Sequence, residues 1–292
     1  GERLYLGYQP PYHFEGILRF LANRVIPGIE YVTDKEYCRT VRILNSNKEE
    51  FNGSIMVGHA PHRDALAIIL SNSLMEVAPE VLIRVGHLFD LGSDPVVIHD
   101  TLKSMNEIKP NLFEMGMRLP SSFNPFEMVV RAVLGQQITV KAARTIAGRF
   151  VNTFGKPVTT EIPQLTHTFP LPEEIVALDG LIENHLGPLG IMARRARAIG
   201  ALAELFVQGE IDFYRCEEPQ EAIAKLLDIP GIGEWTADYI AMRTMGCSDI
   251  FLETDVGIRK ALEPYTQKGL LQLAEQWRPW RSYATVALWN SL

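Results

Sequence analysis

A short glycine-containing segment at residues 226–243, LLDIPGIGEWTADYIAMR, carries the residue types best suited to binding chemistry. Gly231 and Gly233 lie one residue apart, directly before a helical pattern. Glycine permits unusual dihedrals and close approach of another backbone. The first amides of a helix have no intrahelical partner and lie at the positive end of the helix dipole. We therefore predict that the amides of Gly231, Gly233 and Thr236 bind an anion such as a phosphate. A bare G-x-G is more often a packing corner, but the longer pattern L-x-x-I-P-G-I-G favours the anion site.

Two aromatic side chains and one carboxylate follow this hairpin. Trp235 and Tyr239 are four residues apart on the expected helix, so they share a face. They either pack into the core, as most apolar helix faces do, or flank a slot. Asp255 follows Thr254 and precedes another helical pattern. Aspartate at such a position is commonly a helix N-cap. Alternatively Thr254 caps the helix and Asp255 points across a groove; the residue types leave both readings open.

The elements that position these residues change character near residue 98. Before it, apolar spacing predicts helices at 14–25 and 74–91, with short strands at 37–44, 53–59 and 65–71 between them. We expect these to form a small α+β domain with an antiparallel sheet over residues 1–98, leaving Gly1 out as a processed end or an expression remnant. Beyond it the remainder is predicted to be all-α, with helices at 99–107, 125–136, 139–153, 172–178, 192–208, 218–227, 234–245, 255–263 and 268–290.

The composition limits the function classes. The chain is 47% hydrophobic and 22% charged and has no apolar run of the roughly 18 residues that span a bilayer, so no membrane association is expected. The net charge of −7 opposes general affinity for nucleic acid, so any DNA binding must be local, as at the hairpin amides. Three distant cysteines, Cys38, Cys216 and Cys247, predict neither a disulfide framework nor a zinc or iron–sulfur site, and favour a reducing cytosol.

Five segments, in order along nearly the whole chain, resemble the helix-hairpin-helix DNA glycosylases, most closely the AlkA-type 3-methyladenine DNA glycosylase II family. The segments are QPPYHFEGILRFLANR near the N-terminus, RAVLGQQITVKAA at 131–143, the hairpin, DIFLETD at 249–255 and WRPWRSYATVALW at 277–289. The fold implied is an α+β domain at 1–98, similar to half of a TATA-binding protein. Two helical subdomains are implied to follow, with the site in the cleft between them: 121–247, which contains the hairpin, and 99–120 together with 248–292.

The resemblance also implies a role for individual residues. Asp255 matches the catalytic aspartate, and the base pocket is matched by Trp235, Tyr239, Phe20 and Trp289. The DNA-binding positions are matched by Gly231, Gly233, Thr236 and Gln137. No cofactor is implied, apart from a structural Na⁺ or K⁺ held in the hairpin by the carbonyls of Leu227, Ile229 and Ile232.

The function implied is monofunctional removal of alkylated bases from double-stranded DNA, by a monomer located in the bacterial cytoplasm at the nucleoid. Strand-cleaving relatives carry a lysine two residues after the second hairpin glycine, where this chain has Trp235. Gln137 stands where the best-known family member inserts a leucine wedge into DNA, and it either acts as a wedge or caps the helix starting near Thr139. A glycosylase for 8-oxoguanine or deaminated bases, or a non-catalytic DNA-binding protein, remains an alternative. The arginine-rich run 194–197 is interpreted as a solvated helix face, and contact with the DNA backbone is the alternative.

Overall fold

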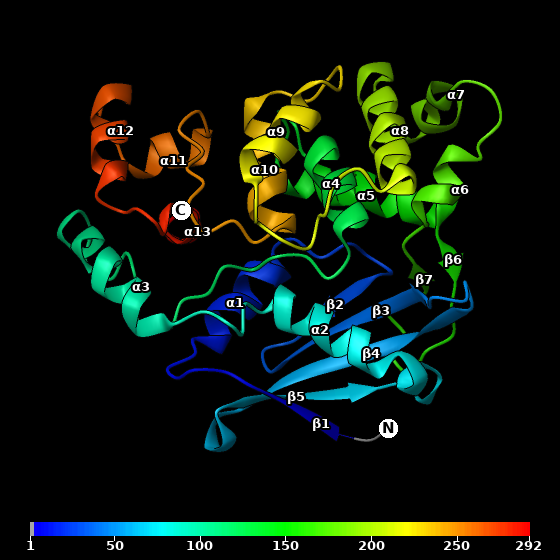
Figure 1. Ribbon diagram of the computed structural model, residues 1–292, viewed down its shortest axis with the longest axis horizontal. Coiled ribbons are helices and arrows are strands. Elements are labelled where there is room, and N and C mark those ends of the chain that lie inside the picture. The colour runs from blue at the N-terminus through cyan, green and yellow to red at the C-terminus, as the bar shows by residue number, and fades with distance from the viewer. Residues whose placement is uncertain (1–2) are drawn as a thin grey trace.

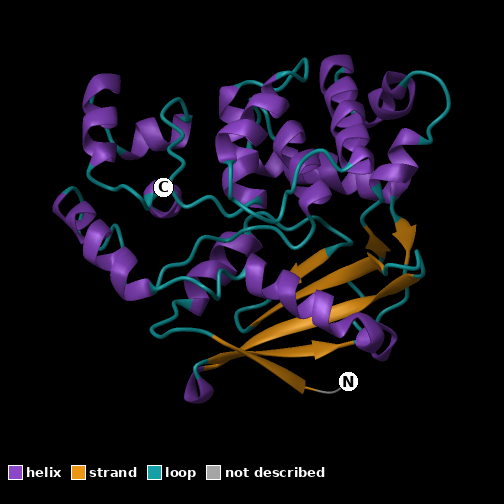
Figure 2. Ribbon diagram, in the orientation of Figure 1, coloured by secondary structure: helices purple, strands orange, loops and turns teal. Residues whose placement is uncertain are grey.

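The computed structural model describes residues 3–292, so the expectation for Gly1 lies outside the described residues. One five-stranded antiparallel sheet lies beneath a layer of helices (Figures 1 and 2). Its strand order is β1-β5-β4-β3-β2. The strands are β1 Arg3–Gly7, β2 Glu30–Val32, β3 Glu36–Leu44, β4 Glu50–Ala60 and β5 Ala65–Leu70. The expected α+β domain with an antiparallel sheet is therefore confirmed, while β1 and the three-residue β2 are additions to the predicted strands.

Two helices pack with this sheet in one apolar core, α1 (Phe14–Ala22) and α2 (Ala78–Leu88). The second begins four residues later than the pattern predicted, because Pro79 occupies its first turn and a 3₁₀ segment over Asn72–Val77 precedes it. Proline fits the first turn of a helix, where its missing N–H has no intrahelical role. The helical boundary therefore follows the proline more closely than the apolar spacing.

The remainder of the chain is helical, as expected. The helices are α3 Pro95–Leu102, α4 Pro125–Leu134, α5 Val140–Phe154, α6 Pro172–Val176, α7 Ile182–Leu186, α8 Ala193–Gln208, α9 Pro219–Leu227, α10 Glu234–Thr244, α11 Val256–Ala261, α12 Gln267–Glu275 and α13 Arg281–Asn290. Short 3₁₀ segments at Lys103–Glu107 and Gly187–Leu189 lie between these helices, and a third at Pro61–Arg63 connects β4 to β5 in the sheet domain. Two short strands, β6 Lys156–Pro157 and β7 His167–Thr168, pair with each other.

The prediction of a single helix over 268–290 is wrong. It is divided into α12 and α13, and Pro279 lies between them. Proline has no N–H for the helical hydrogen-bond ladder, and it disfavours the helical conformation of the preceding residue. The break turns α13 into a separate helix that carries Trp289 toward the centre of the molecule.

Two apolar cores meet at α10. One contains the sheet, α1 and α2 together with apolar residues of α11, α12 and α13, and the other contains α4, α5 and α8. Met242 of α10 belongs to the first core and Ile240 to the second, while Tyr239 packs against both. Figure 1 accordingly shows α11–α13 on one side of α10 and α4–α8 on the other. The exact domain boundaries given above stay a prediction.

A buried ionic cluster joins the N-terminal domain to the second core. Glu127 of α4 accepts hydrogen bonds from Arg39 of β3 (2.6 Å) and from Arg131 (2.9 Å), and Arg131 also contacts Glu30 (3.0 Å). Burial acts to raise the pKa of Glu30, but Arg131 and Arg39 outweigh burial, so its pKa lies below the usual value. Tyr37 donates its hydroxyl hydrogen to the same carboxylate (2.7 Å). Glu30 therefore stays ionised among its guanidinium partners.

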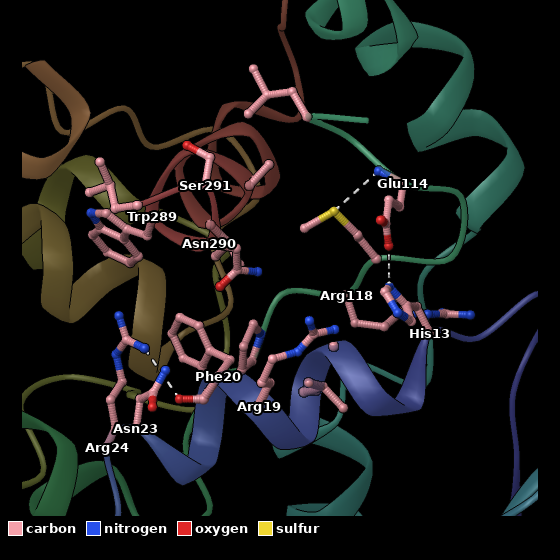
Figure 3. A pocket seen from close by; sticks show the side chains of 18 of the residues that line it. His13, Arg19, Phe20, Asn23, Arg24, Glu114, Arg118, Trp289, Asn290 and Ser291 are labelled. Atoms are coloured by element: carbon pink, nitrogen blue, oxygen red, sulfur yellow. Dashed lines mark hydrogen bonds and ion pairs between the residues drawn. The ribbon is translucent and has the colours of Figure 1, made fainter. Parts of the chain in front are cut away.

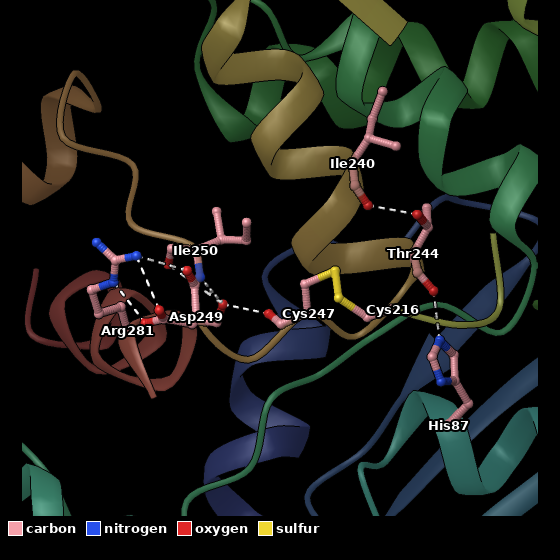
Figure 4. The surroundings of a disulfide bond; sticks show 9 residues. His87, Cys216, Ile240, Thr244, Cys247, Asp249, Ile250 and Arg281 are labelled. Atoms are coloured by element: carbon pink, nitrogen blue, oxygen red, sulfur yellow. Dashed lines mark hydrogen bonds and ion pairs between the residues drawn. A yellow bond between two sulfur atoms is a disulfide. The ribbon is translucent and has the colours of Figure 1, made fainter. Parts of the chain in front are cut away.

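The expectation that the cysteines form no disulfide is wrong, because Cys216 is bonded to Cys247 (Figure 4). The segment between α8 and α9 returns to the end of α10, and this tertiary contact brings together two residues 31 positions apart in the sequence. Spacing along the chain does not reveal such a contact. Cys38 is buried and unpaired. The argument for a reducing compartment, which rested on unpaired cysteines, therefore loses its basis.

Candidate functional site

The hairpin between α9 and α10 is a tight turn that needs one left-handed residue. That residue is Gly231, with a φ of 103°, whereas Gly233 is extended and is the N-cap of α10. The amide of Ile232 donates to the carbonyl of Ile229 (3.0 Å) and closes the turn. A Cβ on Gly233 would meet nothing within 4 Å, so the backbone here is open to an approaching ligand. The turn thus presents bare backbone at the start of a helix.

The amides of Gly231, Gly233 and Thr236 find no hydrogen-bond acceptor among residues 3–292. Three donors at the positive end of an 11-residue helix form the arrangement that binds phosphates in proteins. The carbonyls of Leu227 and Ile232 likewise accept no hydrogen bond within the described chain, although that of Ile229 accepts the one from Ile232. Carbonyl oxygens are ligands suited to a small hard cation. The turn fits both expected ligands, and both stay predictions.

Asp255 caps α11 and also binds two tryptophans. Its Oδ1 accepts from the amide of Ile258 and from Nε1 of Trp289, and its Oδ2 accepts from Nε1 of Trp235, each at 3.0 Å. The reading in which Thr254 supplies the cap is therefore wrong, since Asp255 is itself the N-cap. One carboxylate performs both tasks, because its two oxygens offer about four lone-pair positions. Three N–H donors from three helices fix its orientation.

The aromatic side chains form a stack beside this carboxylate. Trp235 and Tyr239 lie with ring centroids 5.1 Å apart at 18°, and Tyr239 lies 6.0 Å from Trp289. The first two rings stack on each other, so no slot lies between them. A cavity of about 650 Å³ instead lies beside them, and Trp235, Tyr239, Trp289 and Asp255 all line it. A cavity of this size is within the range of small-molecule sites in proteins, roughly 300 to 1,000 Å³.

Phe20 is placed differently from the other three expected pocket residues. It is 2% exposed and does not line the cavity of Asp255. It lines a neighbouring cavity of about 680 Å³, and its ring lies 6.5 Å from that of Trp289 (Figure 3). The guanidinium of Arg24 covers the ring, with Cζ 3.7 Å from the ring centroid. The sequence analysis expected the ring of Phe20 to form part of the base pocket. In the structure, the guanidinium of Arg24 covers that ring.

The loop between α4 and α5 is tied to the hairpin by Gln136, a residue that sequence reasoning did not single out. Its Nε2 donates to the carbonyl of Gly231 and to the hydroxyl of Thr236, both at 3.0 Å. The next residue, Gln137, is exposed with a φ of 54°. The alternative in which Gln137 caps α5 is wrong, because Thr139 is the N-cap and accepts from the amide of Ala142 (3.2 Å). The sequence feature that could have indicated a role for Gln136 is its position directly before Gln137, the expected DNA-binding residue.

Arg194 and Arg195 contact this loop and the hairpin, so the run 194–197 is more than a solvated face. Arg195 donates to the carbonyl of Gln136, and a Cβ on Gly231 would meet Cγ of Arg194 at 3.4 Å. Arg197 faces outward and pairs with Glu183 (2.8 Å). Arg195 thus ties the loop to α8, and Arg194 of the same helix lies next to Gly231 of the hairpin.

Comparisons with known proteins identify the family of this chain. Residues 3–124 match the AlkA N-terminal domain, and residues 130–268 match the HhH-GPD superfamily base excision DNA repair protein. DNA-3-methyladenine glycosylase 2 of Escherichia coli is 33% identical over 97% of this chain and 95% of that protein. A probable bifunctional transcriptional activator/DNA repair enzyme AlkA of Mycobacterium tuberculosis is 35% identical over 99% of this chain. This chain spans only 57% of the length of that relative.

Structural similarity supports the same fold. The 3-methyladenine DNA-glycosylase structure from Archaeoglobus fulgidus has a TM-score of 0.77 at 21% identity, covering 98% of this chain and 97% of the other. Within residues 3–292, no helix combines the length and apolar character that crossing a membrane requires. The sequence match to the Escherichia coli protein extends across both the sheet domain and the helical core. The chain therefore belongs to the HhH-GPD superfamily of base excision DNA repair proteins, in the branch that carries an AlkA N-terminal domain.

Proposed function

We propose that this chain is a monofunctional DNA glycosylase that flips an alkylated, 3-methyladenine-type base out of duplex DNA and hydrolyses its N-glycosidic bond. The carboxylate of Asp255, fixed by two indole N–H groups at the wall of a base-sized cavity, carries this proposal. A base within the duplex stack is out of reach of any such carboxylate, so the nucleotide must first be flipped. The hairpin amides and the exposed loop at Gln137 are the expected contacts with the flanking DNA.

The chemistry follows from a single negative charge. When the bond between C1′ and the base nitrogen breaks, its electron pair leaves with the base and the sugar becomes oxocarbenium-like. A fixed carboxylate stabilises that developing positive charge, and water then adds to C1′ and gives up a proton. The indole N–H groups of Trp235 and Trp289 position Asp255 for this task without neutralising it.

The expected partner is double-stranded DNA, bound by a monomer in the bacterial cytoplasm at the nucleoid. Because the chain carries a net charge of −7, we infer that its contacts with the DNA phosphates are concentrated at the amides of Gly231, Gly233 and Thr236. Oriented amides hold a phosphate without adding a positive charge to the protein. A monovalent cation on the carbonyls of Leu227, Ile229 and Ile232 would add positive charge at the same turn.

We expect base release without strand cleavage. Trp235 occupies the lysine position of strand-cleaving relatives, and no lysine is among the residues that line the cavity of Asp255. The test incubates duplexes carrying single lesions with the protein and scores strand breaks before and after alkali. Breaks that appear only after alkali, with no adduct trapped by borohydride, are the expected result. A covalent protein–DNA adduct that borohydride traps as fast as the base is excised would overturn the monofunctional assignment. If no base is released from any duplex, the result would favour a DNA-binding protein without catalytic activity.

We expect Gln137→Ala to lower both lesion affinity and the single-turnover excision rate, each by about tenfold. Gln137 is exposed at the tip of a loop that Gln136 holds against the hairpin, so its amide is placed to enter the duplex and hydrogen-bond the unpaired base. A lost hydrogen bond of this kind costs about 1 to 1.5 kcal/mol, or about tenfold. Gln267→Ala, at an exposed position on α12, is the control. Unchanged affinity and rate in Gln137→Ala would exclude the wedge role.

A further inference from the structure

The neighbouring cavity of about 680 Å³ opens between three parts of the chain that are distant in sequence. Its lining comes from α1, from the segment 109–120 and from the C-terminal end of α13, and Lys141 and Arg144 of α5 also line it. Figure 3 shows Arg19 on α1 at the bottom of the view, with Asn290 and Ser291 of α13 above it. The proposed chemistry at Asp255 does not use this cavity.

Three exposed basic side chains meet at the neighbouring cavity: Arg19 of α1, Lys109, and Lys141 of α5. None of the three forms an ion pair with a carboxylate of residues 3–292. Among the described residues, Glu114 is the one acidic side chain of the lining, and it pairs with His13 (2.9 Å). Like charges gathered at one surface repel each other, so this arrangement favours a bound polyanion.

The neighbouring cavity and the cavity of Asp255 share part of their walls. The residues that line both are Arg24, Val140, Arg144, Trp289 and Leu292. Burial lowers the pKa of Arg24 to about 10, and Asp255 is among the groups that oppose this shift, so Arg24 belongs electrostatically to the cavity of Asp255. Val140 is 49% exposed and Leu292 61%, so the shared boundary is open to an incoming ligand. A nucleotide whose base enters the cavity of Asp255 therefore has the neighbouring cavity beside its sugar and phosphates.

The hairpin lies on the other side of the cavity of Asp255. Trp235 follows the hairpin directly and lines the cavity of Asp255 but not the neighbouring one. The three residues with the expected phosphate-binding amides, Gly231, Gly233 and Thr236, do not line the neighbouring cavity either. A DNA strand held by the hairpin on one side of a flipped nucleotide would thus bring its other flank to the basic side chains.

We propose that Arg19, Lys109 and Lys141 bind the phosphodiester backbone of the damaged strand, on the side of the flipped nucleotide away from the hairpin. Basic side chains that neutralise phosphates release counterions, which supplies affinity without regard to sequence. The amides of Asn23, Asn111 and Asn290 line the same cavity and offer N–H donors for phosphate and sugar oxygens. This inference rests on the proposed glycosylase function and adds a second phosphate contact to the one at the hairpin amides.

The first test measures affinity for a lesion duplex over a range of salt concentrations. Each phosphate contact of a basic side chain contributes about 0.9 to the steepness with which log affinity falls against log salt. We expect the triple variant Arg19→Gln/Lys109→Gln/Lys141→Gln to bind about a hundredfold more weakly at moderate salt, with a slope shallower by about 2 to 3. The control Lys35→Gln/Lys48→Gln/Lys268→Gln makes the same change of net charge at exposed positions that line neither cavity, and should change both quantities far less.

The second test locates the contact with uncharged methylphosphonate linkages, placed in the damaged strand on one flank of the lesion at a time. In the wild type, neutral linkages on either flank should weaken binding. In the triple variant, one flank should have no further effect, while the flank bound by the hairpin should still matter. Unchanged affinity and slope in the triple variant, an equal loss in the control variant, or an undiminished response to both neutral flanks would overturn the proposal. A wild type that binds lesion duplexes but releases no base would instead overturn the proposed function.

Discussion

Asp255→Asn is expected to fold and to bind damaged DNA, yet to excise alkylated bases on the order of a hundredfold or more slowly, because a neutral amide does not stabilise a developing cation. Asparagine is nearly as good an N-cap as aspartate, so its oxygen can retain the amide hydrogen bond of Ile258. Its NH₂ group would then face the indole N–H of one tryptophan, donor against donor. We therefore expect a small fall in Tm beside a large fall in rate.

Asp94→Asn is the matched control for this variant. Asp94 is also an N-cap aspartate and accepts from the amides of Val96 and Val97 at the start of α3, but it does not line the cavity of Asp255. It should show the cost of changing a cap while leaving excision unchanged. The measurements are thermal unfolding, affinity for a lesion duplex and single-turnover excision. An Asp255→Asn variant that melts like the wild type and excises at a comparable rate would mean that the chemistry belongs to another residue.

Local signals in the sequence predict the parts of this site that are formed by neighbouring residues. The hairpin needs one residue with a positive φ at Gly231 and a helix directly after Gly233, and both are encoded within a few positions. Likewise, the strands β3, β4 and β5 follow from short runs bounded by turn residues. These features depend on backbone dihedrals and alternation of apolar residues, which the sequence displays directly.

Tertiary contacts explain what sequence reasoning missed. By residue type, Thr254 and Asp255 are equally plausible N-caps of α11. The indole N–H groups of α10 and α13, which bind the carboxylate of Asp255, are contacts that the sequence does not reveal. The disulfide required knowing that the segment before α9 returns to the end of α10. Phe20 has the residue type of a pocket wall, but its ring is covered by Arg24, a residue only four positions away whose side-chain direction depends on packing. Residue type and spacing do not encode these side-chain arrangements.

The buried cluster between the sheet and the helical core provides the largest expected effect on stability. Glu127 is 2% exposed and accepts hydrogen bonds from Arg39 and Arg131. Glu127→Gln preserves the shape of the side chain but removes the carboxylate that directly contacts the buried Arg39, which leaves Glu30 as the nearby negative charge. Removal of one partner of a buried ion pair costs about 3 to 5 kcal/mol of unfolding free energy. We expect a loss of this size in urea or thermal unfolding. Glu80→Gln, which breaks a partly exposed helical pair with Arg84, is the control and should change stability by less than about 1 kcal/mol.

A double variant separates the two contributions to that loss. If the penalty in Glu127→Gln comes from the guanidinium of Arg39, which loses its directly contacting carboxylate, then adding Arg39→Met should restore part of the lost stability, because an apolar side chain of similar length needs no countercharge. If the loss comes only from the hydrogen bond to Arg131, the second substitution should destabilise the protein further. Arg131 also donates to the backbone carbonyl of Arg24, so the cluster supports the residue at the junction of the two cavities. A Glu127→Gln variant as stable as the wild type would show that the cluster tolerates an unpaired charge, contrary to the expected cost of burying one.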